Sequence, residues 1–154
     1  MDDKDIELLR YLQDNGRAKL NDISKASKLA TTTAHKRIKK LEKDGIIKGY
    51  AAIIDAEKVG KPLLAYIMIR TSMQNKEEND RNPQKTLCKS LAKLPFVQSA
   101  HVISGEWDVL LKVRARDMKE LNDFIVKELR LNPVVDRTMT FFVMEDFKDT
   151  LSFL

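Results

Sequence analysis

The chain has 154 residues, 43% of them hydrophobic, and a formal net charge of +5 at pH 7. This hydrophobic content supports a packed core and excludes an intrinsically disordered chain, and the single cysteine, Cys88, excludes intramolecular disulfides and multi-cysteine zinc clusters. No apolar stretch is long enough to cross a bilayer, and the acidic N-terminus does not match a secretory signal, so we expect a cytoplasmic protein without a membrane partner.

Two helices are expected at the start of the chain. Over residues 2–15, apolar side chains recur at helical spacing, and acidic residues stand where the helix dipole favours negative charge. The pair Asn15-Gly16 predicts the end of this helix, with Gly16 in the left-handed conformation that glycine enters without steric cost. A second helix is expected over residues 20–27. Its inward side chains are expected to be Leu20, Ile23 and Ala26.

A third, strongly basic helix is predicted over residues 31–44. Residues 17–48 hold ten Lys and Arg against three acidic residues, which is the electrostatic footprint of a DNA-binding head. Its buried stripe is expected to comprise Ala34, Ile38 and Leu41. Residues 46–54 are rich in β formers and predict a strand or hairpin that serves as a wing, and residues 55–62 predict a linker.

The second half of the chain predicts a split βαβ arrangement, β-α-β-β-α-β. Strands are expected over residues 63–71, 96–104, 106–115 and 134–147. One helix is expected to begin at Pro83, after a polar connection over residues 72–84, and to bury Leu87, Leu91 and Leu94. A second helix is expected after Asp117, where a capping-box-like start includes Glu120.

Two motifs, in order and at the right separation, resemble those of the Lrp/AsnC (feast/famine) transcription regulators. The second is the turn Gly105-Glu106-Trp107-Asp108, which is similar to that family's Gly-x-aromatic-Asp turn. The residues that carry the first motif are Asp5, Leu8, Leu9, Leu12, Asn15, Gly16, Arg17, Ile23, Leu29, Arg37, Ile38, Leu41, Glu42, Gly45, Ile47, Gly49 and Tyr50.

This resemblance implies an α+β protein with an N-terminal winged helix-turn-helix domain (residues 1–54), a linker (55–62) and a C-terminal ferredoxin-like βαββαβ domain (63–154). It also implies a homodimer formed by sheet packing, with tetramers or octamers as further assemblies, and an amino acid or related small molecule as effector. No cofactor and no metal site are implied.

The head departs from the family pattern at three positions. Lys19 and Ala30 stand where the family usually has serine, an N-cap whose loss costs roughly 1 kcal/mol, so Thr31 or a neighbour is expected to cap the third helix instead. Lys28 stands where glycine is usual, and is expected in a backbone conformation that glycine enters more easily.

A helix in the major groove reads bases mainly with its N-terminal residues, so Thr32, Thr33 and Lys36 are the base-reading candidates. The candidates for phosphate contacts are His35, Lys39, Lys40, Arg17 and Lys48. Arg37 lies to one side of the buried stripe, so a structural ion pair within the head and a DNA contact both stay open for it. The alternative for the whole set is an ordinary solvated helix face.

In the second domain, the candidate effector site is the Gly105 turn together with the last strand. Gly105 permits close backbone approach, and Asp108 is suited to accept hydrogen bonds from an ammonium group. The full set of candidates is Gly105, Trp107, Asp108, Thr138 and Thr140. The alternative is that Gly105 only closes a hairpin, Trp107 packs in an interface and Asp108 pairs with a neighbouring base.

The function that these features favour is a sequence-specific transcriptional regulator that binds double-stranded DNA. A non-specific, architectural DNA-binding protein is the main alternative. An enzyme is disfavoured, because no catalytic triad, phosphate-binding loop, dinucleotide motif or activated cysteine stands out. A single-strand RNA binder would need a run of exposed aromatic residues on its strands, which is missing.

Overall fold

The computed structural model describes the whole chain except residues 73–79, 81 and 151, and it divides into two compact units. Unit 1, the head, comprises residues 1–54 and 147–154, and unit 2, the sheet unit, comprises residues 55–146. The expected linker 55–62 therefore groups with the sheet unit, and the last eight residues group with the head rather than with the sheet. The structure confirms the α+β class. Within the described residues, no helix is both long and apolar enough to span a membrane.

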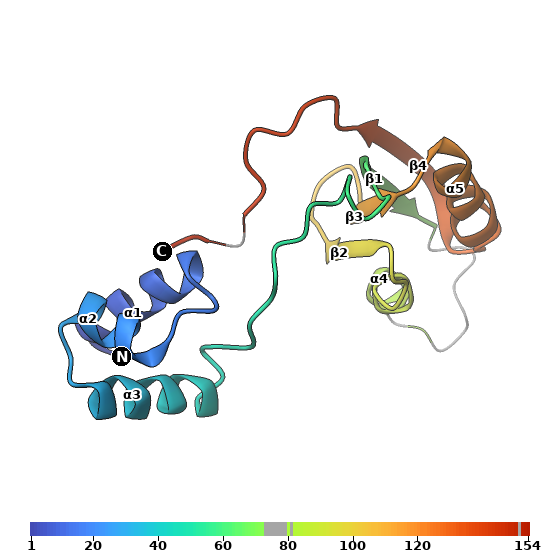
Figure 1. The fold of residues 1–154 in the computed structure, drawn as a ribbon. Helices are drawn as coiled ribbons and strands as arrows, with labels where there is room; N and C mark the ends of the chain where they lie inside the picture. Colours follow the sequence, from blue (N-terminus) through green and yellow to red (C-terminus); the bar gives the residue numbers. More distant parts are fainter. Residues whose placement is uncertain (73–79, 81, 151) are drawn as a thin grey trace. The chain divides into compact units, whose positions relative to one another are not determined.

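The described residues of the head form the helices α1 (Asp3–Asp14), α2 (Leu20–Ser27) and α3 (Thr31–Lys43) (Figure 1). A capping box begins α1: the Asp2 side chain accepts from the Asp5 backbone N–H, and the Asp5 side chain accepts from the Asp2 N–H. The core of the head is small. It comprises the buried side chains of Leu8, Leu12, Ile23, Ala34 and Ile38.

Two local expectations for the head are corrected. Gly16 does not take a positive φ; α1 ends at Asn15, whose side chain donates to the Tyr11 carbonyl. On α2, Ala26 is exposed and Ser27 is buried instead. The polar Ser27 side chain can be buried because its hydroxyl donates a hydrogen bond to the Ile23 carbonyl at 2.8 Å.

Residues 46–54 form no strand within this chain, so the prediction of a wing strand there is wrong. A strand needs a neighbour for its backbone hydrogen bonds, and β propensity alone does not supply one. The side chains of Tyr50, Ile53 and Ile54 in this segment are exposed. Instead, Gly45 at φ +71° turns the chain away after the end of α3. The Tyr50 hydroxyl then donates a hydrogen bond to the Glu42 side chain, which keeps this segment close to α3.

The sheet unit has the β-α-β-β-α-β order that the sequence predicts. Its elements are β1 (Leu63–Thr71), α4 (Pro83–Leu91), β2 (Val97–Val102), β3 (Val109–Ala115), α5 (Met118–Phe124) continued by the π-helix η1 (Ile125–Arg130), and β4 (Val135–Phe142). The strands form one antiparallel sheet in the order β2-β3-β1-β4. β2, β3 and β4 are each shorter than expected, and most of the connection expected over 72–84 lies outside the described residues.

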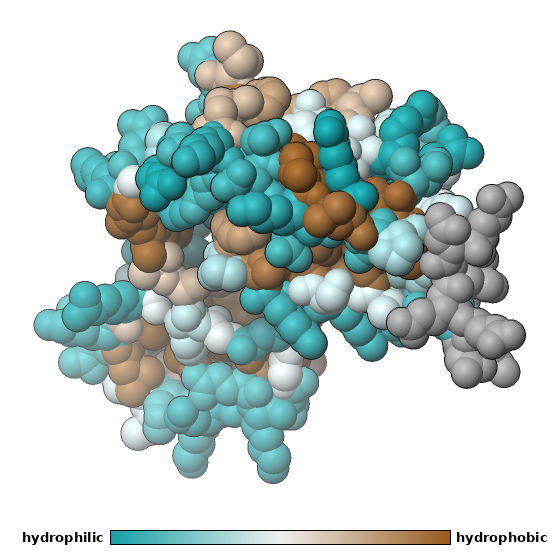
Figure 2. All heavy atoms as spheres, turned by 90° about the vertical axis from the view of Figure 1, so that its right-hand side faces the viewer, coloured by the Kyte–Doolittle hydropathy of each residue, from teal (hydrophilic) through white to brown (hydrophobic). Residues whose placement is uncertain are grey.

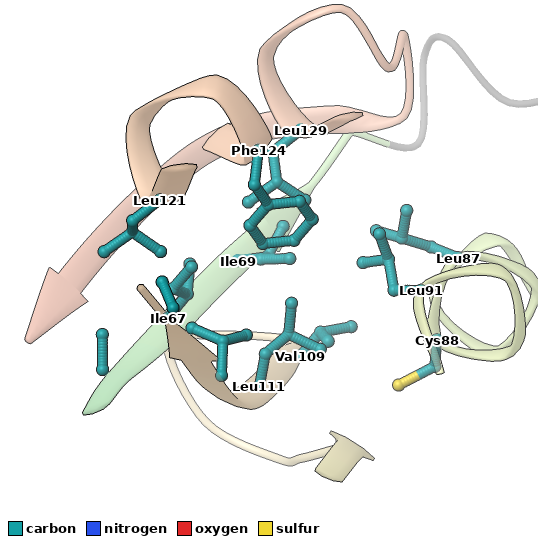
Figure 3. Packing of buried hydrophobic residues seen from close by; sticks show 13 residues of the cluster. Ile67, Ile69, Leu87, Cys88, Leu91, Val109, Leu111, Leu121, Phe124 and Leu129 are labelled. Atoms are coloured by element: carbon teal, nitrogen blue, oxygen red, sulfur yellow. The ribbon is translucent and has the colours of Figure 1, made fainter. Parts of the chain in front are cut away.

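α4 and α5 pack on one face of the sheet (Figure 3). Leu87 and Leu91 on α4, with Leu121 and Phe124 on α5, meet a fully buried layer of strand side chains. That layer consists of Ala65, Ile67, Ile69, Val109, Leu111 and Val113. Because side chains alternate along a strand, the intervening residues lie on the other face. This helix-free face carries Met139 and Phe141, which are 44% and 45% exposed.

Candidate nucleic-acid interface and effector site

The exposed face of α3 gathers most of the DNA-binding candidates. Ala34, Ile38 and Leu41 are buried, as predicted, so the helix is anchored by one stripe and the opposite side reaches solvent. The candidates on this exposed side are Thr32, Thr33, His35, Lys36, Lys39 and Lys40. In Figure 2 the surface at the lower edge of the view, where α3 lies, is predominantly hydrophilic. Arg17, between α1 and α2, and Lys48, after α3, are also exposed.

The basic residues of this face differ in their partners. Lys39 donates to the Glu42 carboxylate at 2.9 Å. Within the part of the chain that the structure describes, Lys36 and Lys40 form no ion pair. The pair between Lys39 and Glu42 lies at the surface, where ion pairs contribute little to stability, so an incoming phosphate can replace the carboxylate.

Arg37 is held inside the head. Its guanidinium pairs with Asp2 at 2.8 Å and with Asp5 at 2.7 Å, which ties the middle of α3 to the capping box of α1. Hydrogen bonds to Asp5 and Asp2 raise the pKa of Arg37, and the Arg37 hydrogen bond lowers the pKa of Asp2. Burial works to raise the pKa of Asp5, but hydrogen bonds from Arg37 and the Asp2 backbone outweigh it, so the pKa of Asp5 is also lowered. Of the two roles left open for Arg37, the geometry therefore favours the structural ion pair.

The start of α3 lacks a side-chain cap. Ala30 occupies the N-cap position, and no side chain accepts from the first-turn N–H groups. Thr31 does not take over, because its hydroxyl donates to the Ser24 hydroxyl at 3.3 Å. Lys19 likewise begins α2 without a side-chain cap, and Lys28 ends α2 in the left-handed conformation at φ 54°, as its place in the sequence predicts.

In the sheet unit, the β2–β3 connection and the start of β4 meet at one end of the sheet. Gly105 takes φ +131°, and a Cβ built there would contact nothing within 4 Å, so the position requires glycine for its backbone conformation rather than for space. Trp107 is buried, with the Arg137 guanidinium 4.8 Å from its ring centroid. Arg137 also donates to Glu106 at 3.0 Å.

Asp108 is engaged with β1. Its Oδ2 accepts from the Thr71 backbone N–H at 2.7 Å and from the Thr71 hydroxyl at 2.9 Å. Its own backbone N–H donates to the Ile69 carbonyl at 3.0 Å. These three hydrogen bonds fix the turn against the end of β1, so Asp108 acts here as a positioning group.

Thr138 and Thr140 share one face, as predicted, but it is the helix-covered face. They pair with Ile69 and Ile67, whose side chains are fully buried beneath the helices. Arg137 precedes Thr138 and lies on the opposite face, next to Trp107. The structure therefore brings Arg137, not the two threonines, to the Gly105 turn. The sequence reading missed Arg137, because only the register of β4 shows which strand residue reaches the turn.

Sequence comparisons find relatives along nearly the whole chain. Residues 1–48 match the model described as a winged helix-turn-helix DNA-binding domain, and residues 64–153 match that of the Lrp/AsnC ligand binding domain. The HTH-type transcriptional regulator FL11 of Pyrococcus horikoshii is 33% identical over 150 residues, covering 97% of this chain and 93% of the relative. The leucine-responsive regulatory protein of Haemophilus influenzae is 35% identical over 150 residues, covering 97% and 87%.

Solved structures agree with these relatives. A transcriptional regulator from Neisseria meningitidis, crystallised as a complex with L-Met, superposes with a TM-score of 0.89 at 29% identity, covering 100% of this chain and 96% of that one. An AsnC family transcriptional regulator from Agrobacterium tumefaciens gives a TM-score of 0.88 at 27% identity, covering 100% and 97%. The similarity thus extends over both units of the chain.

Proposed function

Because the chain belongs to the Lrp/AsnC family of DNA-binding transcriptional regulators, we propose that it recognises specific DNA sequences with α3 and responds to a free amino acid. The observation that carries the first part is the exposed, basic side of α3, which is anchored by Ala34, Ile38 and Leu41. A helix held in this way can enter the major groove, about 12 Å wide, without unfolding any of the head.

Each candidate residue has a proposed role in this interface. Thr32, Thr33 and Lys36, near the leading end of α3, contact base edges, since hydroxyl, methyl and ammonium groups match the patterns that the major groove presents. The phosphate contacts are proposed for Arg17, His35, Lys39, Lys40 and Lys48. Arg37 acts indirectly, by holding α3 against α1 through Asp2 and Asp5.

We propose that the protein acts as a homodimer formed through the helix-free face of its sheet. Met139 and Phe141 leave an apolar surface there, and burying such a surface against a second copy is favourable. A dimer would present two heads to half-sites about one helical turn of DNA, or a multiple of it, apart (roughly 34 Å per turn).

The amino-acid response is supported by two relatives. The Neisseria meningitidis structure holds L-Met, and the Haemophilus influenzae relative is named leucine-responsive. An effector changes DNA binding only if its affinity differs between two states of the protein, so the response requires a coupling between the sheet unit and the head.

The test is selection of bound fragments from genomic DNA at fixed salt concentration, with and without each of the twenty amino acids. We expect one recurring sequence motif, bound at least 1,000-fold more tightly than scrambled DNA, as a specific regulator requires (typically ~10³–10⁷). We also expect one or more amino acids to change its recovery. Uniform recovery of all fragments would instead identify a non-specific architectural protein.

A further inference from the structure

We propose that Glu42 restrains Lys39 on α3 and so weakens binding to DNA that lacks the recognised sequence. The inference rests on the proposed function, and it adds an acidic residue that limits wrong contacts. A protein can favour one partner either by strengthening the right complex or by placing a repulsive group against the wrong ones. Glu42 acts in the second way.

The Glu42 carboxylate is fixed by two donors. One of its oxygens, Oε2, accepts from Lys39 Nζ at 2.9 Å, and the other, Oε1, accepts from the Tyr50 hydroxyl at 3.1 Å. Lys39 precedes Glu42 on α3, whereas Tyr50 follows α3 in the chain. The side chains of Lys39 and Glu42 are 64% and 30% exposed, so an incoming DNA phosphate can reach the pair.

Lys39 differs in this respect from its neighbours on the exposed side of α3. Lys36 and Lys40 form no ion pair with any residue that the structure describes, so each can meet a phosphate directly. Lys39 has to leave Glu42 before it can do the same. One of the basic residues of this face is therefore available only by exchange of its partner.

Tyr50 keeps the carboxylate in place during that exchange. When a phosphate takes over Lys39 Nζ, the hydrogen bond from the Tyr50 hydroxyl still holds Glu42 Oε1. Hydrogen bonds from Lys39 and Tyr50 lower the pKa of Glu42, so its carboxylate is ionised at neutral pH. A fixed negative charge then stays beside the phosphate and repels it, which opposes the exchange.

The exchange is more favourable in a specific complex than in a non-specific one. Base contacts by α3 fix the helix against the duplex, so a phosphate can be held at hydrogen-bonding distance from Lys39. Non-specific complexes lack those contacts and depend on electrostatic attraction to the phosphates. Without a fixed phosphate, Lys39 gains little by leaving Glu42. Glu42 thus reduces the non-specific affinity more than the specific affinity.

The experiment measures binding of the full chain by fluorescence anisotropy at several salt concentrations, on the selected motif and on its scrambled sequence. Glu42→Gln removes the charge and keeps an oxygen that can accept a hydrogen bond. It is combined with Lys39→Ala in a double variant. Tyr50→Phe removes only the hydroxyl that holds Glu42. The matched control is Asp44→Asn, which removes one negative charge at the exposed C-cap of the same helix.

Glu42→Gln should bind scrambled DNA roughly 5-fold more tightly, near the upper end of what an exposed ion pair contributes. The slope of log affinity against log salt should steepen by about 0.9 on that DNA, because Lys39 becomes available to one more phosphate. The motif should gain less than about 2-fold. In the Lys39→Ala background, Glu42→Gln should change neither quantity. Tyr50→Phe should act in the same direction to a smaller extent, and Asp44→Asn should stay within about 2-fold of the parent.

The inference is overturned if Glu42→Gln leaves the affinity for scrambled DNA unchanged, if Asp44→Asn gives the same gain, or if the gain persists without Lys39. An equal gain on the motif, in a parent that distinguishes the two duplexes, also contradicts it. A merely structural role for Glu42 would lower the stability of the head without steepening the salt slope. Failure of the proposed sequence recognition is separate: the parent would then bind all duplexes alike, and the comparison on scrambled DNA with and without Lys39 would still decide the inference.

Discussion

The head and the sheet unit stabilise their elements in different ways. The sheet unit packs two helices on a fully buried layer of strand side chains, and α4 and α5 are each capped by the side chain of Asn82 or Asp117. The head has a smaller core, and α2 and α3 both begin without a side-chain cap. The helix proposed to read DNA is therefore retained by one apolar stripe and by ion pairs, whereas the sheet unit holds most of the buried core.

Substitutions in the two buried cores should lower the free energy of unfolding the most. Ile67→Ala removes a fully buried side chain from the sheet unit and should lower its free energy of unfolding by about 2 to 5 kcal/mol. The transition is followed by fluorescence of Trp107, which lies in that unit. Leu8→Ala is the matched change in the head, followed by far-ultraviolet circular dichroism of its helices. If each variant shifts the fluorescence transition and the circular dichroism transition equally, the two units are not stabilised by separate cores, which contradicts the difference described above.

DNA contacts should give the next largest effects. Lys36→Ala should lose about 1 to 3 kcal/mol of discrimination between the selected motif and its variants, since it removes a base contact. Lys40→Ala should weaken binding to all sequences and reduce the slope of log affinity against log salt by about one per contact. Lys39→Ala should do the same to a smaller extent, because Lys39 already pairs with Glu42.

Binding is measured by fluorescence anisotropy at several salt concentrations. Lys119→Ala, an exposed lysine of the sheet unit, is the control for loss of one positive charge. Equal losses for Lys36→Ala and Lys119→Ala would contradict the assignment of the groove-reading surface to α3.

Restoring the missing cap should stabilise the head by a smaller amount. Ala30→Ser supplies a hydroxyl that can accept from the first-turn N–H groups of α3, and we expect a gain of about 1 kcal/mol in the free energy of unfolding. Lys28→Gly should also stabilise, by less than about 1 kcal/mol, because relief of the left-handed backbone is partly offset by the freedom of glycine in the unfolded chain. Thermal denaturation tests both, and no gain from Ala30→Ser would show that the first turn is satisfied in another way.

The smallest effect is expected in the stability of the head at acid pH. The pKa values of Asp2 and Asp5 in the folded head are both lowered from about 3.8, so their contribution to stability is present above that pH and is lost as the pH falls through the lowered values. In the Arg37→Gln variant, the stability of the head's helices should therefore depend much less on pH in this acid range. An unchanged acid profile in Arg37→Gln would mean that the three-residue ion pair contributes nothing measurable.

The sequence predicted the parts of the fold that local patterns determine. The stripe of Ala34, Ile38 and Leu41 defined α3, and the alternation of strands and helices defined the sheet unit, because both depend on residues that are near one another in the chain. The wing strand over 46–54 was wrong, since a strand depends on a neighbour that β propensity does not reveal.

The candidate effector site shows the same limit. The turn at Gly105 could be found from its glycine and aromatic residue, but the partner of Trp107 could not, because it depends on the register between β1 and β4. Thr138 and Thr140 were chosen correctly as residues that share a face. Only the pairing with Ile69 and Ile67 shows that this face is the one beneath the helices.

The most direct test of groove reading by α3 is methylation interference on a selected DNA site. Methyl groups on guanine N7 occupy the major groove, and those on adenine N3 occupy the minor groove. If α3 reads the major groove, N7 methylation at the motif should block binding, and the Lys36→Ala variant should become insensitive at one of those positions. Interference from N3 methylation alone, with N7 methylation tolerated throughout the motif, would contradict the account.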